Sequence, residues 1–170
     1  MQNNSNIYGD TRLSKRILNE IKNLKTEPSD FIYAIALENN IYEWHFTLRG
    51  MEGSPYENGL YHGIVVLPKE YPMKGPDIRF LTKNGRFEVN KNICLSVTSY
   101  HPESWSPLWK VRNVLESLNS FFITDAAGIG SIKKTDQERK KLATDSHSFV
   151  CSKCGPVTEQ AKLIGKKMEV

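Results

Sequence analysis

The sequence predicts a single α+β domain in which helices and strands occupy separate parts of the chain. Three observations predict it. A helical period comes first, strand-like segments separated by turn residues follow, and helical periods return only after a long aperiodic stretch. Helices segregated in this way from an antiparallel sheet define the α+β class. The length of 170 residues suits one compact domain.

The first helix is expected directly after residues 1–10, a polar N-terminal segment that we expect to be flexible. Its apolar residues recur at helical spacing and predict one buried stripe: Leu13, Ile17, Ile21 and Leu24. Asp10 is a suitable N-cap, and Pro28 ends the helix because proline disfavours helical geometry in the residue before it. The basic residues lie largely off the stripe and give the helix a basic face: Arg12, Lys15, Arg16 and Lys22.

Four strands are expected in an antiparallel meander. Alternating apolar residues indicate the first two strands, namely Phe31, Tyr33, Ile35 and Leu37, then Tyr42, Trp44, Phe46 and Leu48. A short turn at residues 38–40 joins these two strands as a hairpin. The third strand, residues 60–67, follows a turn region rich in Gly, Pro and Asn. The fourth, residues 77–81, follows a proline-rich loop at residues 68–76.

A long aperiodic stretch, residues 82–107, contains turn-forming residues and scattered aromatic residues. A loop of this length inside a compact domain is usually functional. Cys94 lies in its middle, away from any apolar stripe, so its position favours a reactive thiol over a small buried hydrophobic residue. The thiolate form would be the nucleophile.

Helical spacing returns after this loop. One apolar stripe, suited to lying across the sheet, is formed by Leu108, Val111, Leu115, Leu118 and Phe122. Further on, Thr135 and Glu138 form a capping box that begins a final helix running toward Phe149. The domain is therefore expected to occupy residues 11–150, and residues 151–170 are expected to be a polar tail.

Composition excludes several classes of protein. The net charge of +4 is modest, and its basic residues are spread along the chain, so we expect no nucleic-acid partner. No stretch approaches the roughly 18 apolar residues of a membrane span, and the N-terminus lacks a secretory signal. Three cysteines are an odd, sparse set that favours a reducing compartment. We expect a soluble monomer.

Two cysteines near the end of the sequence form half of a zinc-binding pattern. Cys151-Ser152-Lys153-Cys154 has the spacing of two ligands, but the sequence contains no second such pair. A structural zinc site needs four ligands, and His147 could supply a third at best. We therefore expect free thiols and no metal; the alternative is that the two cysteines bind a metal or form a disulfide between molecules.

The order and spacing of several motifs resemble those of the ubiquitin-conjugating enzymes. These motifs lie between Leu13 and Phe149 and are Ser54-Pro55-Tyr56, Tyr71-Pro72-Met73-Lys74-Gly75-Pro76, Ile93-Cys94-Leu95 and Trp105-Ser106-Pro107-Leu108. Residues 84–96, together with His101-Pro102-Glu103-Ser104-Trp105, are most similar to the J-type branch, which is anchored in the endoplasmic reticulum membrane. The resemblance implies the ubiquitin-conjugating (UBC) fold.

This resemblance implies an activity without a cofactor. Cys94 would accept ubiquitin as a thioester from an ATP-consuming activating enzyme, and a ligase would promote its transfer to lysine of a protein substrate. Resemblance to the J-type branch also admits Ser or Thr hydroxyl acceptors and a role in endoplasmic-reticulum-associated degradation. Because that branch carries a membrane anchor at its far end, we expect the full-length protein to continue past Val170 and to act at the cytosolic face of this membrane.

The resemblance also implies partner-binding residues. Those that would meet the activating enzyme and the ligase are Arg12, Lys15, Arg16, Met73, Pro107 and Leu108. Leu108 has an alternative role as the first residue of the core stripe in its helix. Glu116 and Ser120 match positions that hold the donor ubiquitin, although Glu116 replaces the usual apolar residue.

Asn84 occupies the place of the family's asparagine, but Thr82 and Lys83 replace the usual histidine and proline before it, and the interval to Cys94 is longer. Its side-chain amide could donate a hydrogen bond to the oxyanion formed during transfer. Alternatively, Asn84 and Gly85 only shape a turn. The two roles are compatible, because the shape of the loop sets the position of the donor.

Two other functions have to be weighed. Cys94 with His101 could form the nucleophile and base of a thiol hydrolase, but the sequence offers no separate glycine-rich oxyanion loop. A loop histidine that holds Trp105 or the backbone is favoured. The other alternative, a non-catalytic ubiquitin-binding variant of the same fold, usually lacks the cysteine.

Overall fold

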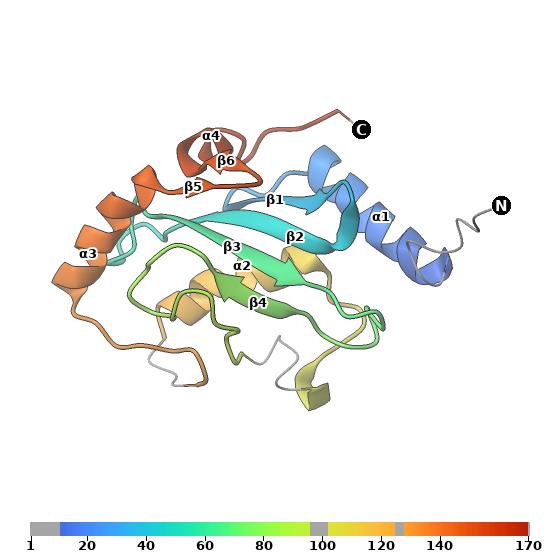
Figure 1. The fold of residues 1–170 in the computed structure, drawn as a ribbon, viewed down its shortest axis with the longest axis horizontal. Coiled ribbons are helices and arrows are strands. Elements are labelled where there is room, and N and C mark those ends of the chain that lie inside the picture. Colours follow the sequence, from blue (N-terminus) through green and yellow to red (C-terminus); the bar gives the residue numbers. More distant parts are fainter. Residues whose placement is uncertain (1–10, 96–101, 125–127, 170) are drawn as a thin grey trace.

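A computed structural model describes residues 11–95, 102–124 and 128–169, with side chains from residue 14 onward. The elements are, in order, α1 (Thr11–Thr26), β1 (Ile32–Leu37), β2 (Asn40–Arg49), β3 (Leu60–Val66), β4 (Asp77–Phe80), the 3-10 turn η1 (Pro102–Ser104), α2 (Val111–Phe122), α3 (Asp136–Asp145), the 3-10 turn η2 (Ser146–Ser148), β5 (Val150–Cys151), β6 (Gly155–Pro156) and α4 (Val157–Ala161). Strands β1 to β4 form an antiparallel sheet in sequence order (Figure 1), which confirms the predicted meander. The suggested cap Asp10 lies outside the described residues.

Helix α2 packs across one face of the sheet and closes the main core. The predicted stripe is buried from Val111 to Phe122, whereas Leu108 precedes the helix and is exposed. From β2, the side chains of Trp44, Phe46 and Leu48 enter this core. The Phe122 ring contacts four aromatic rings from the sheet side, those of Tyr56, Tyr61, Phe80 and Phe87. Each large apolar side chain buried here contributes about 1.5–3 kcal/mol.

Strand β1 has apolar residues on both faces, and this makes its inward face ambiguous in the sequence. Ile32, Ala34 and Ala36 pair with Leu48, Phe46 and Trp44 of β2 and therefore share the core face. The alternating set that indicates the strand in the sequence includes Tyr33 and Ile35, which lie on the opposite face. Phe31 precedes the strand and is exposed. Apolar residues occupy the second face because it is covered too.

Residues 150–169, which we call the C-terminal strap, do not form the expected polar tail. The predicted final helix stops at Asp145, and after η2 the chain forms the hairpin of β5 and β6 and then α4. Cys151, Val157 and Gln160 are buried. The strap packs on the sheet face opposite α2 (Figure 1), and its end bonds to α1 through Met168 N–H and the Lys25 carbonyl, at 2.9 Å. The strap was not predicted because it has too few buried apolar residues to form a recognisable periodic pattern in a polar sequence.

A buried carboxylate joins α1 to the proline-rich loop and to α2. Glu20 is 4% exposed and lies three residues after Ile17, on the buried stripe of α1. Its Oε2 accepts the Tyr71 hydroxyl at 2.7 Å and the Arg16 Nε–H at 3.0 Å, and its Oε1 accepts the Val111 N–H at 2.7 Å. The last bond also places negative charge at the N-terminus of α2, where the helix dipole favours it. A buried carboxylate is stable only when its oxygens are bonded in this way.

The same contact fixes the protonation state of Tyr71. Burial, together with the neighbouring Glu20 carboxylate, raises the pKa of Tyr71 far above its ordinary value. The hydroxyl therefore keeps its proton throughout the physiological pH range and remains a donor to Glu20.

Replacing Glu20 should destabilise the protein strongly. In Glu20→Ala the Tyr71 hydroxyl and the Val111 N–H lose their acceptor in a buried place, so we expect a loss of about 3–5 kcal/mol in the free energy of unfolding. Urea unfolding measures this as a lower midpoint at constant slope.

The matched control is Glu70→Ala, in the loop that also contains Tyr71. Glu70 is exposed and lies 3.9 Å from Lys74, so its removal should change stability by less than about 0.5 kcal/mol. Equal midpoints for the two variants would contradict the role given to Glu20.

Candidate active site

The segment that carries Cys94 is held by backbone hydrogen bonds on both sides. On one side, Ile93 N–H donates to the Ile78 carbonyl of β4 at 2.9 Å. On the other, Cys94 N–H donates to the Ile129 carbonyl at 2.8 Å. Ile93 and Leu95 are buried, and Cys94 between them is partly exposed. A segment held in this way, with a buried residue on each side of Cys94, thus keeps one thiol partly exposed.

A glycine gives the backbone of Cys94 room. A Cβ atom at Gly128 would lie 3.0 Å from the Cys94 carbonyl oxygen and 3.6 Å from Cys94 Cβ. Any side chain at this position would push against the segment that carries the thiol. The sequence gives no sign of this contact, because a close approach of this kind is visible only once the chain has folded.

Asn84 is engaged in a turn. Its side chain is 0% exposed. Oδ1 accepts the backbone N–H groups of Arg86 at 2.9 Å and Phe87 at 2.8 Å, and Nδ2 donates to the Thr82 carbonyl at 3.0 Å. These bonds satisfy three backbone groups of the loop before the cysteine segment. The sequence left both roles of Asn84 open. The hydrogen bonds of its side chain favour the turn-shaping role over the role of oxyanion donor.

A cleft of about 560 Å³ lies beside this turn, between it and α3. Its lining includes Asn84, Phe87 and Leu142 but not Cys94. The thiol is therefore displayed at the surface rather than inside this cleft. Such a position suits a reaction partner as large as a protein.

Two loops carry exposed apolar side chains at one end of the molecule. Met73 is 67% exposed and Leu108 is 84% exposed, so Leu108 does not open the core stripe. Trp105 joins the loops, because its Nε1–H donates to the Pro72 carbonyl at 2.7 Å and its ring packs against Tyr71. Pro107 is partly exposed beside Leu108. Exposed apolar residues on a braced frame are typical of a protein-binding surface.

The basic residues of α1 differ in their surroundings. Lys15 is exposed, as a docking residue should be. Arg16 is instead engaged within the molecule: it binds Glu20, and its guanidinium donates to the carbonyls of Pro107 at 3.0 Å and Trp109 at 2.9 Å. Arg16 therefore positions the loop that carries Leu108. The side chain of Arg12 lies outside the described residues.

The two suggested donor-contact residues lie on α2. Ser120 is exposed, and Glu116 is partly exposed and pairs with Arg112 at 3.3 Å. The ion pair with Arg112 accommodates the acidic side chain of Glu116 at a position where the family usually has an apolar residue. His101, considered as a possible base, lies outside the described residues. Glu20 was not among the predicted site residues, although a charged residue on the buried stripe of a helix is a signal of a structural role.

Comparison with known proteins identifies relatives. A family model described as ubiquitin-conjugating enzyme matches residues 16–146. Ubiquitin-conjugating enzyme E2 J1 of Homo sapiens is 47% identical over 150 residues, which are 88% of this chain and 47% of that protein. Ubiquitin-conjugating enzyme E2 J2 of Mus musculus is 42% identical over 149 residues, which are 88% of this chain and 58% of that protein. The chain thus spans about half the length of these relatives.

Solved structures share the fold. A putative ubiquitin-conjugating enzyme from Plasmodium yoelii aligns with a TM-score of 0.60 and 28% identity over 70% of this chain and 77% of its own. Human ubiquitin-conjugating enzyme E2 G1 aligns with a TM-score of 0.58 over 65% of this chain and 94% of its own; at 24% identity this likeness concerns the fold alone. In the part of the chain that the structure describes, none of the helices has the length and apolar character needed to cross a bilayer.

Proposed function

The chain belongs to the ubiquitin-conjugating enzyme family, in its J-type branch, and we propose that it carries ubiquitin on Cys94. The observation that supports this most is the position of the thiol, partly exposed between buried Ile93 and Leu95 on a segment fixed from both sides. A carrier needs an accessible nucleophile whose backbone does not move when a large partner approaches.

The proposed reaction has two acyl transfers. The Cys94 thiolate attacks the thioester carbonyl of ubiquitin on an activating enzyme, a new carbon–sulfur bond forms, and the activating enzyme's thiolate leaves. A lysine amine, or a Ser or Thr hydroxyl, of a substrate then attacks the new thioester, and the Cys94 thiolate leaves. The first step is thiol exchange and needs no base from this chain. In the second step the amine or hydroxyl loses a proton as the amide or ester forms, and the leaving thiolate or solvent takes up that proton.

We propose that α1 and the two apolar loops receive the activating enzyme and the ligase. The exposed side chains suited to contact are Lys15, Met73 and Leu108. Arg16 acts through the Pro107 and Trp109 carbonyls that it binds. The exposed Ser120 and the paired Glu116 are proposed to meet the ubiquitin carried on Cys94.

We further propose that the domain works at the cytosolic face of the endoplasmic reticulum membrane, in the degradation pathway associated with that organelle. Membership of the J-type branch supports this location and pathway. Any anchoring segment would lie outside the residues described.

Charging of Cys94 is the first expected outcome. Incubation with activating enzyme, ATP and ubiquitin should give an adduct that a thiol reductant removes, because thioesters exchange readily with thiols. Cys94→Ser should form a slower adduct that resists the reductant, since an oxyester does not exchange in this way. Denaturing gel electrophoresis with and without reductant distinguishes the two.

Omitting ATP should abolish the adduct on the wild-type protein, and Cys94→Ala should form none. Normal charging of Cys94→Ala would contradict the proposal. Rapid loss of ubiquitin from the charged wild type to water alone would favour a thiol hydrolase.

Truncation of the exposed Leu108 should weaken partner binding without unfolding the protein. If its side chain is buried against the activating enzyme, Leu108→Ala should raise the KM for charging roughly ten- to hundredfold, the loss typical of an apolar anchor. The melting temperature should stay the same, because the side chain is 84% exposed.

Phe31→Ala is the matched control for this experiment. Phe31 is also a large exposed apolar residue, but it lies just before β1, outside the two apolar loops. If both variants charged like the wild type, Leu108 would have no place in the docking surface.

The variant Asn84→Asp separates the two roles of Asn84. It keeps the acceptor oxygen for Arg86 and Phe87 but loses the donor to Thr82, so we expect a lower melting temperature together with discharge to free lysine within about tenfold of wild type. Loss of a genuine oxyanion donor would instead slow discharge on the order of 10²–10³-fold. Single-turnover discharge of pre-charged protein measures the rate, at a temperature where the variant is folded.

Lys83→Ala, which changes the exposed neighbouring residue, should leave both the melting temperature and the discharge rate unchanged. Normal charging and an unchanged melting temperature, with discharge slowed a hundredfold in Asn84→Asp, would overturn the turn-shaping role.

A further inference from the structure

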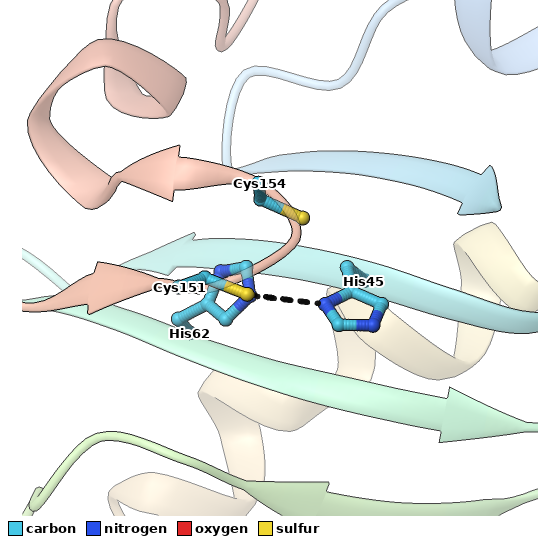
Figure 2. A group of neighbouring side chains, drawn as sticks. All are labelled: His45, His62, Cys151 and Cys154. Carbon is cyan, nitrogen blue, oxygen red and sulfur yellow. Dashed lines mark hydrogen bonds between the residues drawn. The ribbon is translucent and has the colours of Figure 1, made fainter.

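Four potential metal ligands converge where the C-terminal strap meets the sheet. They are His45 from β2, His62 from β3, and Cys151 and Cys154 from the hairpin of the strap, and their ligand atoms all lie within 4.8 Å of one another (Figure 2). His45, His62 and Cys151 are buried. This cluster lies on the sheet face opposite α2 and is separate from Cys94. We propose that it binds one zinc ion, which fastens the strap to the sheet.

The two cysteines come from a tight hairpin. Cys151 ends β5, Gly155 begins β6, and Cys154 lies in the turn between them. Gly155 has a φ of +83°, a conformation that residues with a side chain rarely adopt. The hairpin therefore returns after two intervening residues and presents both sulfurs on one side, which is the usual arrangement of a pair of zinc ligands.

The two histidines, His45 and His62, supply the two zinc ligands that the Cys151–Cys154 pair lacks in the sequence. In the antiparallel register His62 lies opposite Thr47, and His45 opposite Ile64, so both imidazoles point from the same face of adjacent strands. His147, which sequence analysis considered as a third ligand, instead contacts the Asn58 carbonyl. The sheet register, which the sequence pattern alone does not fix, supplies the missing ligands.

Two of the distances between ligand atoms match those of a tetrahedral zinc site. Zn–N bonds of about 2.0–2.1 Å and Zn–S bonds of about 2.3 Å place two nitrogens about 3.3 Å apart, and a nitrogen and a sulfur about 3.6 Å apart. His45 Nδ1 lies 3.3 Å from His62 Nε2, and Cys151 Sγ lies 3.6 Å from His45 Nδ1. A set of two sulfurs and two nitrogens in this geometry favours zinc over the harder divalent cations.

Hydrogen bonds at the outer ring nitrogens direct lone pairs to the centre. His45 Nε2 lies 3.2 Å from Glu43 Oε2, and a carboxylate only accepts, so this nitrogen carries the proton. His62 Nδ1 lies 3.0 Å from Thr47 Oγ1. The Thr47 hydroxyl donates to Gln160 Oε1, so this hydroxyl oxygen accepts from His62. Partners of this kind, beyond the ligands themselves, are typical of metal-bound histidines.

Both inner nitrogens, His45 Nδ1 and His62 Nε2, therefore turn a lone pair toward the centre of the cluster. Zinc would satisfy both, and two thiolates would balance its two positive charges, so that the buried site carries no net charge. Zinc would also explain how so small a strap is held. Strands β5 and β6 have two residues each and α4 has five, too little to be stable alone.

The test is the metal content of the purified protein, measured by mass spectrometry, with two pairs of matched variants. The wild type, purified without chelators, should contain about one zinc per chain. Cys154→Ala and His62→Ala should lose it. Cys94→Ala and His147→Ala, which change a cysteine and a histidine outside the cluster, should retain it.

Two further measurements on the wild type keep the test valid if the ligand variants fail to fold. Removing zinc with a chelator should lower the melting temperature by about 10 °C. Cobalt added to the chelated protein should give the intense visible absorption of a tetrahedral site with thiolate ligands. A zinc-free wild type with no cobalt spectrum, a disulfide between Cys151 and Cys154, or zinc retained in both ligand variants would overturn the proposal.

Discussion

The carboxylate of Glu20 sets the relative placement of three parts of the chain that are distant in sequence. It lies on the buried stripe of α1, and its oxygens bind the proline-rich loop through Tyr71, the start of α2 through Val111, and Arg16. Apolar contacts alone would let these elements slide, since hydrophobic attraction has no direction. Hydrogen bonds to one buried charge have direction, so the loops that display Met73 and Leu108 have a defined spacing. The proposed docking surface is thus positioned by contacts inside the molecule.

In the described part of the chain, backbone contacts position the segment that carries Cys94. Backbone hydrogen bonds to Ile78 and Ile129 hold the segment of Cys94, and Gly128 allows the chain to come close. Asn84 orders the preceding turn through three backbone groups. An enzyme that transfers a thioester between partners gains from a thiol whose backbone is fixed, because each large partner then meets it in the same position. Selectivity then depends on which partners bring their own groups to Cys94.

Sequence patterns predicted those parts of the fold in which local periodicity and burial agree. The meander followed from alternating strands and turn residues, and the α2 stripe followed from its helical spacing. The strap was missed because Val157 and Gln160, three residues apart in a five-residue helix, form too short a pattern to recognise, and one of the two is polar. Arg16 was expected to face a partner, since a charge on a helix gives no sign of the distant carbonyls it will meet. His45 and His62 could not be paired, because strand register depends on the whole sheet.

The position of the strap in the chain also sets an order for its assembly. A ribosome delivers residues 150–169 after every other element described here, and chains begin to fold from the N-terminal end. The sheet and α2 can pair before the strap exists, which leaves Leu60 and Ile64 on the outer face of β3 in contact with water. The core between the sheet and α2 can therefore form while the opposite, partly apolar face of the sheet stays exposed until α4 has been synthesised. During synthesis this face is open to non-specific contacts with other proteins, whereas in the folded protein the strap covers it.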